Sequence, residues 1–365
     1  MASPHPIAGL QNIAPYIAGE SELTGFDRVI KLASNEGAFG PSKKTLEALS
    51  SSAHDFFRYP DGDCNELREL LAGKNNLPKD NIICGAGSDE LISLLCRSYA
   101  GAGDEVLYSA HGFAMYPIYG RTVRATVVAA PENDITVDVD QLLGRVTNKT
   151  KLLFIANPNN PTGTYIPKSE VQRLIDFLPK TVLLVLDAAY SEFVDRKDYS
   201  DGAEFVTTNE NVIMLKTFSK IYGMAGLRLG WMYAPDSVID IINRMRSPFN
   251  VAYSAIVAGI AATKDNKFLK LSQEHNKKWL KWTRNSIRTL GLEVPDSVCN
   301  FVLVRFPQDN GGKLTAESAD NFLKTKGIIV RRMGGYGLPN ALRISIGTGE
   351  EMEITVNALK EFMSL

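Results

Sequence analysis

In four segments of the chain, polar residues that could take part in catalysis or ligand binding directly follow apolar runs. In chain order these segments are GAGSDE (85–90), NPNNPTG (157–163), VLLVLDAAY (182–190) and TFSKIYGMAGLRLGW (217–231). The last segment carries the strongest signal, because Lys220 lies there among small and apolar residues. Loss of hydration at such a position lowers the pKa of an amine and favours imine chemistry. Most lysines are solvated surface charges, but these surroundings favour a chemical role for Lys220.

Asp187 and Asn160 have the right chemistry to hold an aromatic ring. Asp187 ends an apolar run that should be fully buried, so its carboxylate needs a partner. That partner could be a protonated pyridine nitrogen, although a helix N-cap or a buried ion pair would also satisfy it. Tyr190, three residues later, could reach the same ring. Asn160, in a turn fixed by two prolines and a glycine, could donate to a phenolate oxygen or belong to a plain turn.

The remaining polar residues suit an anion such as a phosphate. Ser88 is a good N-cap residue at the start of a helix, where backbone N–H groups bind anions. By itself this segment is more typical of an ordinary capped helix. Ser219 and Arg228 add a hydroxyl and a guanidinium. The order of an anion-binding helix start, an asparagine turn, a buried acid and a lysine followed by an arginine indicates a phosphate-bearing pyridine aldehyde.

Short apolar runs alternate with helical patterns from about residue 80. Continuous β-branched and leucine runs separated by helices predict an α/β fold with a mainly parallel sheet that is covered on both faces. Ligand sites in such sheets lie at the carboxyl ends of the strands, which is where the four segments fall. The expected strands are 81–84, 105–109, 125–130, 151–156, 182–186 and 212–215, and the expected helices are 89–99 and 169–178.

A chain of 365 residues is too long for one hydrophobic core, so we predict two domains. Residues 1–29, rich in proline and glycine, should form an N-terminal arm. Residues 30–248 should form the large domain with the sheet. Residues 249–365 change to an α+β pattern and should form a smaller C-terminal domain, with strands at 301–305, 328–330 and 341–346.

Composition excludes several classes of partner. Lys and Arg (40) nearly balance Asp and Glu (41), so no bulk charge favours nucleic acid or an anionic membrane. The four cysteines and four histidines are scattered without ligand spacing, which disfavours disulfides and a metal site. The sequence shows no basic leader and no run of about 18 apolar residues. We therefore expect a cytoplasmic protein without a metal.

Taken together, these motifs resemble the fold-type I pyridoxal-phosphate aminotransferases. SKIYGMAGLRLG (219–230) and NPNNPTG are highly specific for that superfamily. RYPDG (58–62), GAGSDELI (85–92) and ALRISIGT (341–348) are more particular to the histidinol-phosphate aminotransferases, and the likeness extends from Pro15 to about Glu351. It implies a large domain with a seven-stranded sheet, pyridoxal 5′-phosphate as cofactor, and transamination between histidinol phosphate and 2-oxoglutarate in histidine biosynthesis.

The resemblance also implies roles for individual residues. Lys220 would carry the cofactor as a Schiff base and move the proton of the substrate. Tyr59 would reach the cofactor phosphate from the neighbouring subunit, which makes a homodimer necessary. The other cofactor-binding residues would be Asp187 at the pyridinium nitrogen, Asn160 and Tyr190 at the phenolic oxygen, Phe113 stacked on the ring, Ser88, Thr217, Ser219 and Arg228 around the phosphate, and Asp89, for which no particular contact is implied.

On the substrate side, the resemblance implies that Arg343 holds the carboxylate of glutamate. Together with Arg331 and Tyr16, it would also bind the phosphate of histidinol phosphate. A planar fork of donors suits both anions. Arg331 could instead be a solvated charge at a strand end. Asn35 is expected on the substrate side as well.

Two departures from the family pattern bear on the substrate. The run Asn35-Glu36-Gly37-Ala38 stands where the family usually has Asn-Glu-Asn-Pro, and Phe113 stands where many members have tyrosine. A wider pocket could admit phenylalanine or tyrosine, so an aromatic amino-acid aminotransferase is one alternative. A decarboxylase of a phosphorylated amino acid is a second. A non-enzymatic regulator is a third, although such regulators usually carry an added DNA-binding module for which no residues remain.

Overall fold

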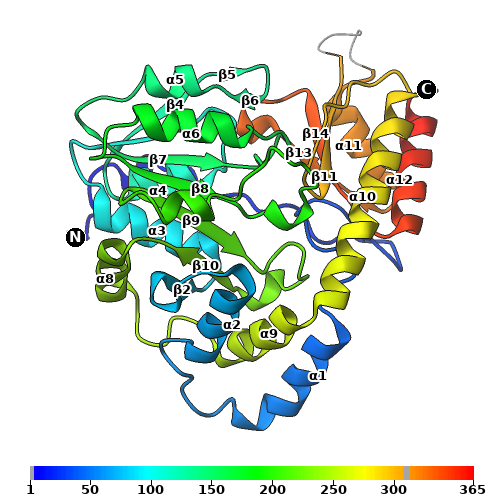
Figure 1. Ribbon diagram of the computed structural model, residues 1–365. Coiled ribbons are helices and arrows are strands. Elements are labelled where there is room, and N and C mark those ends of the chain that lie inside the picture. The colour runs from blue at the N-terminus through cyan, green and yellow to red at the C-terminus, as the bar shows by residue number, and fades with distance from the viewer. Residues whose placement is uncertain (1–3, 308–312) are drawn as a thin grey trace.

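A computed structural model describes residues 4–307 and 313–365 of the chain (Figure 1). Its centre is a seven-stranded sheet in which β10 runs antiparallel to its two neighbours and the other strands are mutually parallel. In spatial order the strands are β2 (Ile82–Gly85), β10 (Gly230–Tyr233), β9 (Val212–Thr217), β8 (Leu183–Asp187), β7 (Thr150–Ala156), β3 (Glu105–Ser109) and β4 (Thr126–Ala130). The predicted α/β fold with a mainly parallel seven-stranded sheet is confirmed.

The six strands predicted for this sheet are present, each within two residues of its expected bounds. Strand β10 was not predicted. Its four residues directly follow the lysine motif, and an apolar run this short has no periodicity that separates a strand from a loop. The chain therefore turns back at Gly230 and inserts an antiparallel strand between β2 and β9.

Both faces of the sheet are apolar, because consecutive residues of a strand point to opposite faces. Leu153 and Ile155 of β7 belong to one hydrophobic cluster, whereas Leu152 and Phe154 belong to another. Two-sided burial of this kind is typical of parallel sheets. The first cluster is covered by α2 (Asn65–Asn75), α5 (Val139–Leu143), α6 (Lys168–Phe177), α7 (Ala203–Val206) and α9 (Tyr253–Lys264), and the second by α3 (Ser88–Tyr99), α4 (Met115–Thr122) and α8 (Asp236–Met245).

A second unit packs around the long helix α10 (Asn266–Arg288). Figure 1 shows α10 beside α12, at the edge of the molecule away from the large sheet. The other elements of this unit are α11 (Ala316–Thr325), α12 (Gly349–Phe362), an antiparallel sheet of β11 (Phe301–Arg305), β14 (Ala341–Ser345) and β13 (Arg331–Arg332), and the parallel pair β1 (Ile30–Lys31) and β12 (Ile328–Ile329). Outside both units lie α1 (Lys43–Ser52), which packs on α9, and the hairpin of β5 (Glu132–Asn133) and β6 (Thr136–Val137).

The domain limits at 29/30 and 248/249 stay predictions. The hydrophobic clusters place residues near both limits in the other unit. Ile30, placed in the large domain, belongs to the hydrophobic cluster of the C-terminal unit. Ala255 of α9, placed in the small domain, belongs to a cluster of the large sheet. Packing therefore favours a boundary within α10. Residues 4–29 contain one short 3₁₀ turn, Leu10–Asn12, which agrees with an arm.

The carboxyl ends of the parallel strands lie along one edge of the large sheet, the edge that faces the small unit (Figure 1). Strands β2, β7, β8 and β9 end there at Gly85, Ala156, Asp187 and Thr217. The residues that follow them are the polar segments identified in the sequence. The topology thus brings segments more than a hundred residues apart to one place, as expected for a ligand site in a parallel sheet.

Gly230, the first residue of β10, permits a close contact with the start of α3. A Cβ atom at this position would lie 2.2 Å from the backbone nitrogen of Ser88 and 2.6 Å from the carbonyl carbon of Gly87. Both are backbone atoms, so the clash made by a larger residue could not be relieved by the movement of a flexible side chain. The contact fixes the start of α3 against the central sheet.

We expect Gly230→Ala to lower the free energy of unfolding by about 1–3 kcal/mol, because it overpacks a rigid contact. Gly226→Ala is the matched control, since a Cβ atom there would meet nothing within 4 Å. Urea unfolding of the two variants and the parent measures the difference. Equal stability of all three proteins would show that the start of α3 can shift freely.

Candidate active site

One pocket of about 680 Å³, open in part to solvent, lies at the carboxyl ends of the strands. Ten of the eleven predicted cofactor-binding residues line it, although they come from five separate segments of the chain. They are Ser88, Asp89, Phe113, Asn160, Asp187, Tyr190, Thr217, Ser219, Lys220 and Arg228. The structure thus gathers the predicted residues, while the role of each stays a prediction.

Lys220 lies three residues beyond the end of β9, with its amine directed into the pocket. Its Nζ atom donates a hydrogen bond to the carbonyl oxygen of Ser34 at 3.3 Å. Burial lowers the pKa of Lys220 to about 8, and the neighbouring Arg343 guanidinium contributes to the same shift. A larger neutral fraction near neutral pH makes this amine a nucleophile and a base, as the sequence predicts.

Asp187 ends the central strand β8 and is buried. One carboxylate oxygen accepts a hydrogen bond from the hydroxyl of Tyr116 at 2.7 Å, and the other accepts one from the backbone N–H of Ala189 at 3.2 Å. Burial raises the pKa of Asp187, and the charge of Lys220 opposes that shift. The carboxylate is therefore held rigidly, in a place where a cationic partner would stabilise its charged form.

Tyr116 was missed by the sequence analysis. It lies in α4, one helical turn after Phe113, and the two rings pack edge to face at 5.7 Å. Tyr119, one turn further, donates a hydrogen bond to Asp89 at 2.7 Å. The recurrence of an aromatic residue every three positions, at Phe113, Tyr116 and Tyr119, was a usable signal. The acidic partners of the two tyrosines, however, lie in distant segments.

Thr217, Ser219 and Arg228 form a cluster of donors at one end of the pocket. The hydroxyl of Thr217 donates to the Ser219 hydroxyl oxygen at 3.0 Å, and a guanidinium nitrogen of Arg228 donates to the same oxygen at 3.3 Å. A Cβ atom on Gly87 would lie 2.5 Å from the Arg228 guanidinium. The glycine at 87 therefore allows the guanidinium to lie against the start of α3.

Ser88 is the first helical residue of α3, whereas the sequence analysis interpreted it as the N-cap. The N-cap position belongs to Gly87, which has a φ of 85° and offers no side chain to the free N–H groups. Those N–H groups and the helix dipole remain directed at the pocket next to Arg228, an arrangement that suits a phosphate. Asp89, in the same first turn, has one carboxylate oxygen that lacks a partner among the described residues.

Arg343 connects the small unit to the pocket. It lies on β14, is 5% exposed, and donates hydrogen bonds to the side-chain oxygen of Asn160 and to the carbonyl oxygen of Ala33. Its guanidinium lies 5.4 Å from the ring centre of Phe301, and its Nε atom is without a partner among the described residues. A buried guanidinium with a donor to spare is suited to bind a carboxylate.

Asn35 joins the N-terminal segment to the same site. Its side-chain amide donates a hydrogen bond to the hydroxyl of Tyr190 at 2.8 Å, and its backbone N–H donates to the Ser345 hydroxyl at 2.8 Å. Asn35 adopts a left-handed backbone conformation, which asparagine tolerates better than most residues. The predicted substrate residue therefore orients a predicted cofactor residue.

Arg331 and Tyr16 lie outside the residues that line the pocket but close to Arg343. Arg331 is the cross-strand partner of Arg343 in the β13–β14 pair, so both side chains leave the same face of the sheet. The Arg331 guanidinium donates to the carbonyl oxygen of Ile17 at 2.6 Å and lies 6.0 Å from the ring centre of Tyr16. The structure thus brings the three predicted anion-binding residues together.

Tyr59 does not reach the pocket of its own chain. Its ring is 82% exposed and stacks on Phe249 at 4.6 Å. Its predicted contact with a cofactor phosphate therefore requires a second copy of the chain and stays a prediction.

Other kinds of site find no support in the part of the chain that the structure describes. Within residues 4–307 and 313–365, no cluster of three or more His, Cys, Asp or Glu side chains is arranged to bind a metal ion. No helix of the described chain is long and apolar enough to cross a membrane. The four cysteines are buried free thiols.

Comparison with known proteins identifies the family. The family model for aminotransferase class I and II matches residues 27–359. A histidinol-phosphate aminotransferase of Paramagnetospirillum magneticum is 55% identical, covering 100% of this chain and 99% of its own, and one of Rhodospirillum rubrum is 52% identical, covering 99% and 97%. The crystal structure of a histidinol-phosphate aminotransferase from Sinorhizobium meliloti in complex with pyridoxal-5′-phosphate has a TM-score of 0.90 at 28% identity and covers 100% of this chain and 99% of its own. The chain belongs to the aminotransferase class I and II family.

Proposed function

We propose that the chain is a histidinol-phosphate aminotransferase, which moves an amino group between histidinol phosphate and 2-oxoglutarate in histidine biosynthesis. One observation carries the substrate assignment: two relatives of this name share more than half of their residues with the chain over nearly its whole length. The pocket supports the reaction class independently, because it combines a lysine of lowered pKa with a buried acid and two arginines nearby.

We propose pyridoxal 5′-phosphate as the cofactor, because the pocket offers a fitting group for each part of it. The free N–H groups of α3 and the Arg228 guanidinium suit the phosphate, and Asp187 suits the ring nitrogen. Asn160 and Tyr190 suit the phenolic oxygen, and Lys220 suits the aldehyde. When bound, this cofactor supplies an electron-withdrawing ring that makes the Cα proton of an amino acid labile.

The protein contributes proton transfer and electrostatics to this reaction. The pKa of Lys220 is lowered to about 8, so part of this amine is neutral near neutral pH and could take up a proton from the Cα atom of a bound substrate and release it again within the pocket. Asp187, fixed by Tyr116 and the Ala189 N–H, would hold the ring nitrogen of the cofactor and favour its protonated form. Phe113 provides a flat apolar face against which the ring can stack.

The two substrates need one anion site that accepts two different anions. Glutamate presents a carboxylate next to the reacting carbon, whereas histidinol phosphate presents a phosphate. Arg343 lies next to Asn160 at the pocket, and Arg331 lies beside it across the β13–β14 pair. A planar guanidinium binds either anion through two parallel hydrogen bonds, so the same arginines can serve both half-reactions.

We also propose a homodimer whose subunits share their active sites. Tyr59 stacks on Phe249, and both rings are exposed, as are Phe56 and Phe57 close to Tyr59 in the sequence. Exposed apolar side chains that gather on a protein surface are typical of an interface. A second copy that covers this group would bring Tyr59 toward the pocket of the partner. The proposal includes a cytoplasmic location, which agrees with the buried free thiols.

Two alternatives use the same machinery. An aromatic amino-acid aminotransferase is favoured if the run from Asn35 to Ala38 leaves a wider pocket. A decarboxylase has the same fold, as the structure of an L-threonine-O-3-phosphate decarboxylase from Porphyromonas gingivalis shows (TM-score 0.79, 22% identity, covering 92% of this chain and 100% of its own). The fold alone does not separate these activities, so the substrate must be tested directly.

We expect histidinol phosphate alone to convert the bound cofactor to its amine-bearing form. In single-turnover absorbance measurements it should react at least about tenfold faster than phenylalanine or tyrosine, because its doubly charged phosphate can bind both Arg331 and Arg343, whereas the carboxylate of those amino acids carries a single charge. Equal or faster conversion by the aromatic amino acids would favour the aromatic alternative. Release of carbon dioxide without any need for a keto acid would favour the decarboxylase.

We expect the rate at which the apo-protein attaches the cofactor covalently to rise with pH and to level off above about pH 8. The sign follows from the pKa of Lys220, which burial lowers to about 8, because only the neutral amine attacks. Absorbance at a series of pH values measures the rate, and Lys220→Ala, which lacks the amine, is the control. The transamination rate of that variant should also be about 10²–10⁴-fold lower than that of the parent. A rate that keeps rising to about pH 10 would contradict a desolvated lysine.

We expect Arg343→Ala to weaken both half-reactions by about 30-fold or more in kcat/KM, since losing a buried charged donor costs at least ~2 kcal/mol. Arg332→Ala is the matched control, because Arg332 is an exposed neighbour on β13 whose partner is Glu317 at 2.7 Å. Separate assays with glutamate and with histidinol phosphate measure the two halves. An effect confined to one substrate would show that Arg343 does not serve both anions.

A further inference from the structure

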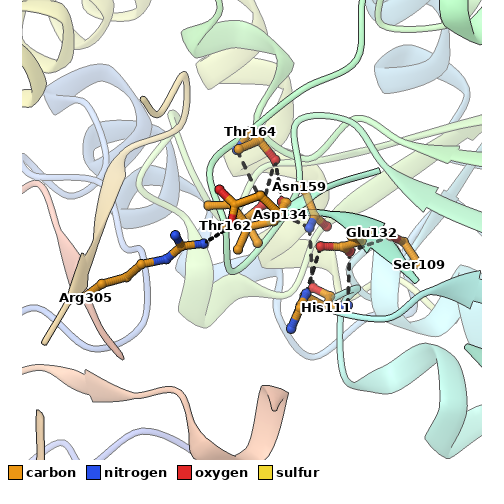
Figure 2. Close-up of polar contacts among 9 residues, drawn as sticks. Ser109, His111, Glu132, Asp134, Asn159, Thr162, Thr164 and Arg305 are labelled. Carbon is orange, nitrogen blue, oxygen red and sulfur yellow. Dashed lines mark hydrogen bonds and ion pairs between the residues drawn. The ribbon is translucent and has the colours of Figure 1, made fainter. Parts of the chain in front are cut away.

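The hairpin of β5 and β6 contributes no residue to the lining of the pocket. Its Glu132 nevertheless contacts Ser109 and His111, in the turn that leads into α4 (Figure 2). The Glu132 side chain, at the start of the hairpin, is 1% exposed. One of its oxygens accepts hydrogen bonds from the Ser109 hydroxyl and from the backbone N–H of His111 at 3.0 Å, and the other lies 2.8 Å from Nδ1 of His111. All three contacts of this buried carboxylate are with the same turn, so both of its oxygens help to hold the turn in place.

The turn held by Glu132 carries three contacts into the pocket. It is tight, because the N–H of Gly112 donates to the carbonyl oxygen of Ser109 at 2.7 Å. Phe113, the next residue, lines the pocket. Helix α4 then begins, and its Tyr116 and Tyr119 donate to Asp187 and Asp89, both at 2.7 Å. A displacement of the turn would therefore move a stacking ring and the donors to both acids together.

The same hairpin also contacts the loop that carries Asn160 (Figure 2). The side-chain amide of Asn159 donates to the carbonyl oxygen of His111 at 3.4 Å and to the Thr162 hydroxyl at 3.0 Å. The Thr164 hydroxyl donates to the carbonyl oxygen of Ile135 in the hairpin at 3.0 Å. The turn after β3 and the loop after β7 are thus connected to each other and to one hairpin.

Asp134, at the tip of the hairpin, differs from Glu132 in both its exposure and its partner. Asp134 accepts a hydrogen bond from Arg305 of β11 at 2.6 Å, and its side chain is 65% exposed. This ion pair connects the hairpin to the small unit but not to the turn before Phe113. A change at Asp134 therefore perturbs the same hairpin without removing the bonds of Glu132.

We propose that Glu132 is a positioning residue for the cofactor. It acts through Ser109 and His111, which fix Phe113 and the start of α4 and so set where Asp187 and Asp89 are held. The inference rests on the proposed function, because it concerns the geometry offered to pyridoxal 5′-phosphate. Loss of the carboxylate leaves the buried Ser109 hydroxyl and the His111 ring without their acceptor and releases the turn.

The test compares Glu132→Ala, Glu132→Gln and the control Asp134→Asn. We expect Glu132→Ala to raise the dissociation constant of the cofactor about tenfold, to weaken the visible circular dichroism of the bound cofactor, and to lower kcat more than it changes KM. Glu132→Gln should recover most of each value, because its amide oxygen still accepts from the turn and its NH₂ can donate to neutral His111. Asp134→Asn should match the parent.

Thermal unfolding of each apo-protein separates positioning from stability. If Glu132→Ala fails to fold, Ser109→Ala removes one of the three bonds and should change the same cofactor constants in the same direction, by about two- to threefold. Lower stability with unchanged cofactor affinity, dichroism and kcat would overturn the proposal, and so would equal effects from Asp134→Asn. Failure of the parent protein itself to bind the cofactor would refute the proposed function instead.

Discussion

Burial of two opposite charges in one pocket is the constraint on which the rest of the structure depends. The same loss of hydration raises the pKa of Asp187 and lowers that of Lys220, so each group moves toward its neutral form. Each also stabilises the charged form of the other through its own charge. This balance keeps an acid available as an anion and an amine available as a base within one enclosed space, at the ends of adjacent strands.

The surrounding elements hold these groups in place from several directions. Helix α4 reaches the acids through Tyr116 and Tyr119, and the hairpin holds the turn in front of that helix through Glu132. The small unit contributes Arg343, whose bond to Asn160 joins the two halves of the molecule at the pocket. A site made from so many segments is rigid only when all of them are folded, so binding of the cofactor and stability of the fold are expected to depend on each other.

Much of this arrangement could be predicted from the sequence, because parallel strands bring their carboxyl ends together and each polar segment follows such a strand. The lysine motif and the acid at the end of β8 are local signals of this kind. The contact between Tyr116 and Asp187 spans 71 residues, and nothing near either residue indicates it. The short strand β10 was missed because four apolar residues show no periodicity. The N-cap at Gly87 was missed because the serine next to it is a more usual capping residue.

The pairing of Arg331 with Arg343 across two short strands has a consequence for work on the isolated protein. Like charges at directly opposed positions cost free energy, and a small dianion that lies between them relieves that cost. We therefore expect inorganic phosphate or sulfate in a buffer to compete with substrate and at the same time to stabilise the folded chain. Rates and melting temperatures measured in such buffers should then differ from those measured in buffers whose anions are bulky or singly charged.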